Sequence, residues 1–147
     1  MNVAIVRAAD WPDMLELAKL HIAAHHEAHG GYDRTIEDVA RTWQAAADIH
    51  ALLARASSGE CVGFIAHRQI SGDERFITDM YVRPDVRKSG IGQKLLRATL
   101  APKSVSLTVW GGNAPAIALY EKLGFLPAGP AIVDQHGRSM IQMKWSV

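Results

Sequence analysis

The segment VRPDVRKSGIG, from Val82 to Gly92, combines glycines and basic residues between a predicted strand and a predicted helix. Glycines let backbone N–H groups approach a ligand without a side chain in the way. The unpaired N–H groups and the positive dipole end of the following helix suit a pyrophosphate. Arg87 and Lys88 add charge, and a charge-assisted hydrogen bond contributes about 1.5–3 kcal/mol. The segment therefore predicts a phosphate-binding turn.

Two common phosphate-binding motifs do not match this turn. The dinucleotide fingerprint has two residues between its second and third glycines, and the P-loop has a paired Gly-Lys-Ser or Gly-Lys-Thr. Glycine-rich turns also join strands to helices for structural reasons alone. On this segment alone, a phosphate site and a purely structural turn both stay open.

Three histidines, His21, His25 and His29, recur at every fourth residue. This spacing places them along one stripe of a helix, and two histidines so spaced can ligate zinc. No separate carboxylate or cysteine cluster completes such a site, so we predict no metal. The alternative role of the stripe is to line a ligand pocket with one or two of its rings.

The elements that must position these residues follow from hydrophobic periodicity and turn signals. Strands are predicted over Val3–Arg7, His50–Arg55, Cys61–Gln69, Arg75–Val82, Ser104–Trp110, Phe125–Ala128 and Ser139–Trp145. Four helices are predicted. The first runs from the N-cap Asp10 to Gly30, and the second begins at the N-cap Thr35. The third begins after Gly90 and ends at Pro102, and the fourth runs from the N-cap Asn113 to Gly124. This order predicts an α/β fold, with a mixed sheet of about seven strands and helices on both faces.

Length and composition predict one domain over residues 1–147. The 16 basic and 15 acidic residues nearly balance, which gives no reason to expect nucleic acid or a membrane surface as a partner. Cys61 is the one cysteine and cannot form an intrachain disulfide. No signal peptide or membrane-spanning stretch is recognised, so we expect a cytoplasmic protein.

Two motifs resemble the signatures of a known family. Arg87-x-x-Gly90-x-Gly92 resembles the acyl-CoA signature of the GNAT superfamily of N-acetyltransferases, Arg/Gln-x-x-Gly-x-Gly/Ala. The run DMYVRP before it and the segment NAPAIALYEKLGF, which begins at Asn113, resemble the family's approach to this motif and its second signature. The order of predicted elements fits as well, so the resemblance covers nearly the whole chain.

The resemblance implies a GNAT fold and acetyl-CoA as co-substrate. Two neighbouring strands would splay, and the pantetheine arm of acetyl-CoA would enter between them. It implies cofactor contacts from the backbone of Met80, Tyr81 and Val82, from the N–H groups of Lys88, Ser89, Gly90, Ile91, Gly92 and Gln93, and from Arg87 beside the pyrophosphate. Asn113 would cap its helix or touch the arm, and Ala116 would leave room for it.

The resemblance also implies direct transfer, in which an amine attacks the thioester. Tyr120 occupies the tyrosine position of the second signature and is the candidate acid for the departing thiolate; its alternative role is a packed aromatic. The glutamate that family members often carry on the fourth strand is absent, because Thr78 and Phe76 hold those positions. Asp79 is the candidate base, although strand alternation points it to the opposite face unless a bulge intervenes. A base that acts through water stays open.

In the family, the first two helices and their connection shape the acceptor pocket. His25, His29 and Tyr32 in that region, and Trp110 after the fifth predicted strand, are therefore candidate acceptor contacts. Three functions stay open: acetylation of a small-molecule amine, acetylation of a protein N-terminus or lysine, and a non-catalytic acyl-CoA-binding module. Members of the family are often homodimers, and the sequence itself leaves the oligomeric state open.

Overall fold

The computed structural model describes residues 2–100 and 103–147. Its strands are β1 (Val3–Arg7), β2 (Ile49–Ala56), β3 (Cys61–Ser71), β4 (Glu74–Val82), β5 (Ser104–Trp110), β6 (Leu126–Pro127), β7 (Ile132–Val133) and β8 (Ser139–Ser146). Its α-helices are α1 (Trp11–His29), α2 (Ile36–Ala45), α3 (Ile91–Ala98) and α4 (Ala114–Lys122), and a short 3₁₀-helix η1 (Pro84–Val86) follows β4.

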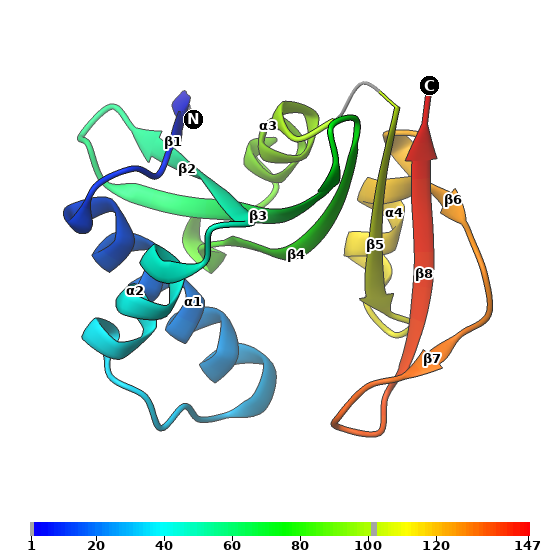
Figure 1. The fold of residues 1–147 in the computed structure, drawn as a ribbon, viewed down its shortest axis with the longest axis horizontal. Helices are drawn as coiled ribbons and strands as arrows, with labels where there is room; N and C mark the ends of the chain where they lie inside the picture. Colours follow the sequence, from blue (N-terminus) through cyan, green and yellow to red (C-terminus); the bar gives the residue numbers. More distant parts are fainter. Residues whose placement is uncertain (1, 101–102) are drawn as a thin grey trace.

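All of these strands belong to one mixed sheet in the order β1-β2-β3-β4-β5-β8-β6, with β7 also paired to β8. The pairings are antiparallel except for that of β4 with β5, which is parallel. Helices α1 and α2 cover one face of β2 to β4, and α3 lies on the other (Figure 1). The expected mixed sheet with helices on both faces is confirmed, and β7 is a strand that the sequence pattern did not predict.

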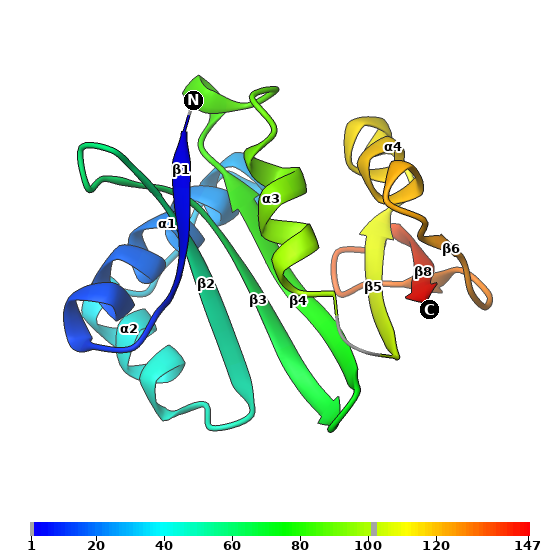
Figure 2. The ribbon, with the colours of Figure 1, turned by 90° about the horizontal axis from the view of Figure 1, so that it is seen from above.

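Strands β4 and β5 separate along most of their length. They pair only from Glu74 with Ser104 to Phe76 with Ser106. Beyond these pairs β4 continues to Val82 and β5 to Trp110, and the two strands diverge (Figure 2). The facing backbone edges of this stretch therefore have no strand partner, which is the splaying that the family resemblance implies.

The helix ends follow the predicted capping residues. Asp10 accepts a hydrogen bond from the backbone N–H of Asp13, and Gly30 ends α1 in the left-handed region at φ 79°. Thr35 and Asn113 cap α2 and α4 through their side-chain oxygens. Helix α3 ends at Ala98, and Pro102, which was expected to terminate it, lies outside the described residues.

The core has a layer on each face of the sheet. Leu95, Leu96 and Phe125 are fully buried on the face of α3 and α4, and Leu17 and Phe64 on the face of α1. In the described part of the chain, no helix is long and apolar enough to cross a membrane.

Candidate functional site

The turn before α3 has the geometry of an anion site. Gly90 caps the helix in the left-handed region at φ 85°, and a Cβ added there would meet nothing within 4 Å. Among the described residues, none accepts a hydrogen bond from the backbone N–H groups of Gly90, Ile91, Gly92 or Gln93. Four free donors at the positive end of a helix fit a diphosphate.

The start of α3 also touches α4. A Cβ added at Gly92 would lie 3.4 Å from Cδ2 of Leu119, the residue before Tyr120. The glycine therefore permits close approach of the two helices where β4 and β5 diverge. A ligand held by the α3 amides would lie beside the helix that carries Tyr120.

Arg87 connects the phosphate turn to α1. Its guanidinium donates to both carboxylate oxygens of Glu27, with Nη1 at 2.7 Å, and its Nε donates to the carbonyl of Val82 at 2.9 Å. The guanidinium also lies 5.4 Å from the centre of the Tyr81 ring. The hydrogen bond from Arg87 lowers the pKa of Glu27, so the pair is ionised at neutral pH. Lys88, next in the chain, takes a left-handed conformation at φ 65°.

A β-bulge decides the direction of Asp79. The register passes from Ala66 opposite Asp79 to His67 opposite Ile77, so Thr78 has no partner on β3. The Thr78 hydroxyl donates instead to the carbonyl of Ala66 at 3.3 Å. Two successive side chains of β4, Thr78 and Asp79, consequently open to the same pocket.

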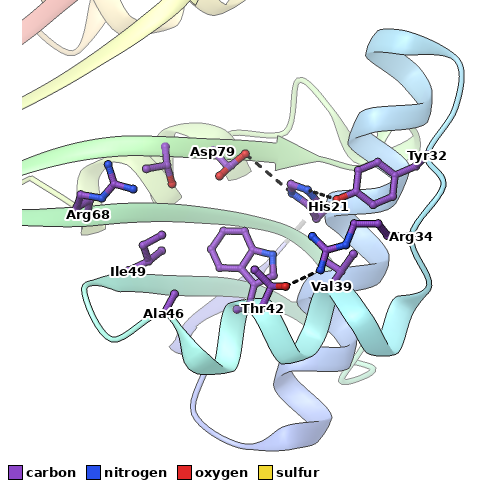
Figure 3. Close-up of a pocket in the computed structure, with 11 residues that line it drawn as sticks. His21, Tyr32, Arg34, Val39, Thr42, Ala46, Ile49, Arg68 and Asp79 are labelled. Atoms are coloured by element: carbon purple, nitrogen blue, oxygen red, sulfur yellow. Dashed lines mark hydrogen bonds and ion pairs between the residues drawn. The ribbon is translucent and has the colours of Figure 1, made fainter. Parts of the chain in front are cut away.

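That pocket lies between α1, α2 and the sheet, with a volume of about 280 Å³ (Figure 3). Its apolar wall is formed by Val39, Trp43, Ala46 and Ile49. Its polar side chains are His21, Tyr32, Arg34, Thr42, Arg68, Thr78 and Asp79. An apolar wall with a few convergent polar groups is typical of a small-molecule site.

The electrostatics of the pocket centre on Asp79 and His21. The carboxylate Oδ1 lies 4.0 Å from Nδ1 of His21, and the Tyr32 hydroxyl lies 3.4 Å from Nε2 of the same ring. Burial raises the pKa of Asp79 to about 6. Burial, reinforced by the charges of His25 and Arg34, lowers the pKa of His21. At pH 7 the pair is therefore a carboxylate beside a neutral imidazole.

Tyr120 is buried in the core layer under α4. The residue is 7% exposed, and its ring packs 5.8 Å from that of Phe125. Burial raises the pKa of Tyr120 to about 12, so its phenol keeps its proton at neutral pH. Asn113 and Ala116 belong to the same motif as Tyr120. The side chain of Asn113 caps α4 by accepting a hydrogen bond from the backbone N–H of Ala116 at 3.3 Å.

The candidate acceptor contacts separate into two groups. Tyr32 lines the pocket with Asp79, and the ring of His25 packs 4.6 Å from it. His29 instead stacks on His136 at 4.0 Å, in the turn between β7 and β8. Trp110 lies at the end of β5, with the Arg138 guanidinium 5.5 Å from its ring. Within the described residues, no three His, Cys, Asp or Glu side chains group as a metal site.

Sequence reasoning did not select His21, Arg34 and Arg68 as site residues. His21 belongs to the histidine stripe that was considered, so its position on the helix was a usable signal. Arg34 precedes the α2 cap Thr35 in the helix connection and offered a weaker one. Arg68 reaches the pocket from β3, and only the packing of α2 against the sheet could have shown this.

Comparison with known proteins identifies the family. The sequence pattern of the acetyltransferase (GNAT) family matches residues 11–125, and the chain belongs to this family. Mycothiol acetyltransferase of Propionibacterium freudenreichii is 31% identical over 150 residues, which cover 86% of this chain and 47% of that protein. The chain thus spans about half the length of that relative.

Two further similar proteins are named for other acceptors. The peptidyl-lysine N-acetyltransferase YjaB of Salmonella typhimurium is 29% identical over 118 residues, which cover 79% of this chain and 76% of that protein. A solved structure of mutant forms of the spermidine/spermine N-acetyltransferase SpeG from Vibrio cholerae superposes with a TM-score of 0.73 at 12% identity, covering 99% of this chain and 95% of that one. The second likeness establishes the shared GNAT fold.

Proposed function

We propose that the chain is an acetyl-CoA-dependent N-acetyltransferase whose acceptor is a small-molecule primary amine. One observation carries this proposal: Asp79 opens to an acceptor-sized pocket from the stretch of β4 that has no partner on β5. A donor bound in the gap and an amine bound in the pocket would meet at this strand.

The donor side rests on backbone groups. The free N–H groups from Gly90 to Gln93 would hold the diphosphate. The unpaired β5-facing edge of Met80, Tyr81 and Val82 would pair with the pantetheine arm as another strand does. Acetyl-CoA supplies the activated thioester when bound.

The acceptor amine must lose a proton before or during attack. A lysine-like amine has a pKa near 10.4, so its neutral form costs about 4.6 kcal/mol at pH 7. Asp79, with a pKa of about 6, is ionised at pH 7 and is a stronger base than an unperturbed carboxylate. It would take the proton directly or through water, with His21 beside it.

The leaving group needs a proton in turn. The amine nitrogen forms a bond to the thioester carbonyl carbon, the carbon–sulfur bond breaks, and the sulfur departs with the electron pair. Tyr120 would donate its phenolic proton to that sulfur, because burial keeps the phenol protonated. Solvent would then restore the proton to Tyr120, leaving an acetamide and a free thiol.

The size and wall of the pocket support a small acceptor over a protein chain. A volume of about 280 Å³ lies just below the range of about 300–1,000 Å³ that is usual for ligand pockets. Acetylation of protein lysine is the competing function, and the likeness to a peptidyl-lysine N-acetyltransferase favours it. A cytoplasmic location and a homodimer stay predictions from the sequence.

The test is an assay of thiol release from acetyl-CoA with a panel of small amines and lysine-containing peptides. We expect turnover with at least one class of small amine and a lower kcat/KM with every peptide. Preference for peptides would move the function to protein acetylation. Tight binding of coenzyme A without turnover of any amine would make the chain a binding module.

A further inference from the structure

Among the side chains that line the pocket, guanidinium groups outnumber carboxylates. Asp79 is the one carboxylate among the lining residues, against two guanidinium groups, Arg34 and Arg68. Arg68 is paired with Asp48, with Nε at 3.2 Å from Oδ2. In the part of the chain that the structure describes, Arg34 has no carboxylate partner. Arg34 is therefore the guanidinium of the pocket lining that no carboxylate of the described residues contacts.

The contacts of Arg34 fix part of its guanidinium and leave part of it available. Its Nη2 donates to the carbonyl of Asp38 at 3.0 Å and to the hydroxyl of Thr42. Its Nε and Nη1 have no acceptor among the described residues. A guanidinium anchored through Nη2 still has N–H donors at Nε and Nη1, and either of them can donate a charge-assisted hydrogen bond to an anion.

Arg34 lines the same pocket as Asp79. His21 lies between Asp79 and Arg34 (Figure 3). The apolar wall, with Val39 and Trp43, runs along the same space. A ligand with its amine at Asp79 and an anionic group at Arg34 would lay its carbon body along this wall.

We propose that the acceptor carries a carboxylate in addition to its amine, and that Arg34 selects it by binding that carboxylate. This inference rests on the proposed function and names its substrate class: amino acids and related amino carboxylates of similar size. A polyamine, which carries several positive charges, does not fit a lining with one carboxylate and two guanidinium groups.

The test compares acceptors that differ only in charge. Three pairs serve: 4-(aminomethyl)benzoate, 4-aminobutanoate and 6-aminohexanoate, each with its own carboxamide. The carboxylate lies far enough from the amine that the amine pKa changes little within a pair. We expect at least one carboxylate to have a kcat/KM about tenfold or more above its carboxamide, in line with a charge-assisted hydrogen bond.

Two arginine variants separate selection from a structural role. Arg34→Gln is expected to bring the kcat/KM values of that pair to within about twofold of each other, whereas Arg34→Lys keeps part of the preference. Arg41→Gln is the matched control, since Arg41 lies on α2, the helix that Arg34 contacts, and its charge is paired to Asp38; the preference is expected to stay. Equal loss for both members of the pair in Arg34→Gln would show that Arg34 only braces α2, and would overturn the inference.

The outcomes also separate this inference from the proposed function. Two outcomes overturn the inference alone. In both, thiol is released with other amines, but either the carboxylates are not preferred over their carboxamides or none of the six compounds is acetylated. Failure to acetylate any amine overturns the proposed function.

Discussion

The carboxylate of Asp79 and the imidazole of His21 face each other at 4.0 Å, although they come from a strand and a helix on different sides of the pocket. Burial moves the pKa of Asp79 up and that of His21 down, so the two pKa values approach one another. The bulge at Thr78 is what turns the carboxylate toward the histidine.

The acid limb of the pH profile should report Asp79. Its carboxylate loses the ability to accept a proton as the pH falls through about 6, so kcat/KM should decline there. Asp79→Asn should remove that inflection and lower kcat by about 10²- to 10⁴-fold, while the titration of the amine itself persists. Asp73→Asn, in the exposed β3–β4 turn, is the control. An unchanged profile in Asp79→Asn would exclude Asp79 as the base.

The same substitution should stabilise the fold. A carboxyl whose pKa rises on folding destabilises the native state as the pH increases from about 4 through 6, and has no such effect below pH 4. The Asp79 side chain is 35% exposed, so solvent screening limits the gain in the free energy of unfolding to about 1 kcal/mol, or about 2–4 °C in Tm at pH 7. Calorimetry at pH 7 and near pH 4.5 measures it. A Tm gain that does not shrink at the lower pH would contradict this origin.

Removal of the Tyr120 hydroxyl should affect chemistry more than binding. Tyr120→Phe is expected to lower kcat by about 10²-fold or more with little change in the KM for acetyl-CoA. Its Tm should stay near that of the wild type, because the ring and its packing on Phe125 are kept. Steady-state kinetics with thermal melts decide between the roles, and an unchanged kcat would leave Tyr120 as a packing residue.

Two glycines with the same backbone conformation allow a matched test of the phosphate turn. Gly90 and Gly59 have φ values of 85° and 89°, and each has open space where a Cβ would stand. Glutamate at either position should cost about 1 kcal/mol of stability through backbone strain. Titration calorimetry with coenzyme A should show lost binding for Gly90→Glu alone. Equal affinity in both variants would make the turn purely structural.

Glu27 should compete with the cofactor for Arg87. If the diphosphate draws Arg87 away from Glu27, then Glu27→Gln should tighten coenzyme A binding by about two- to fivefold, the worth of an exposed ion pair. Glu16→Gln, on the same helix and paired with Lys19, should leave the affinity unchanged. Weaker binding in Glu27→Gln would mean that the pair instead holds Arg87 in its binding position.

Local signals determined much of the fold in advance. The capping side chains of Asp10, Thr35 and Asn113 act within a few residues of their own position, so their helices could be placed from sequence. Strand β7 could not, because its two residues have no periodicity of their own and are ordered by pairing with β8.

Only part of the candidate site could be predicted from the sequence. The phosphate turn is a contiguous motif, and its free amides follow from its glycines and the helix that it starts. The direction of Asp79 depends on how β3 pairs with β4, and a one-residue shift of register leaves no trace in either strand alone. The contact of Arg87 with Glu27 joins residues 60 positions apart, a distance over which spacing carries no information.

Strand β4 is fourth of the seven in the sheet order, yet only three of its residues pair with β5. Hydrogen exchange is normally slowest at the middle of a sheet. Here we expect about every second amide from Ile77 to Val82 to exchange with deuterium as quickly as on an outer strand, until a ligand covers that edge. The most central strand of the sheet would thus be the most direct reporter of donor occupancy.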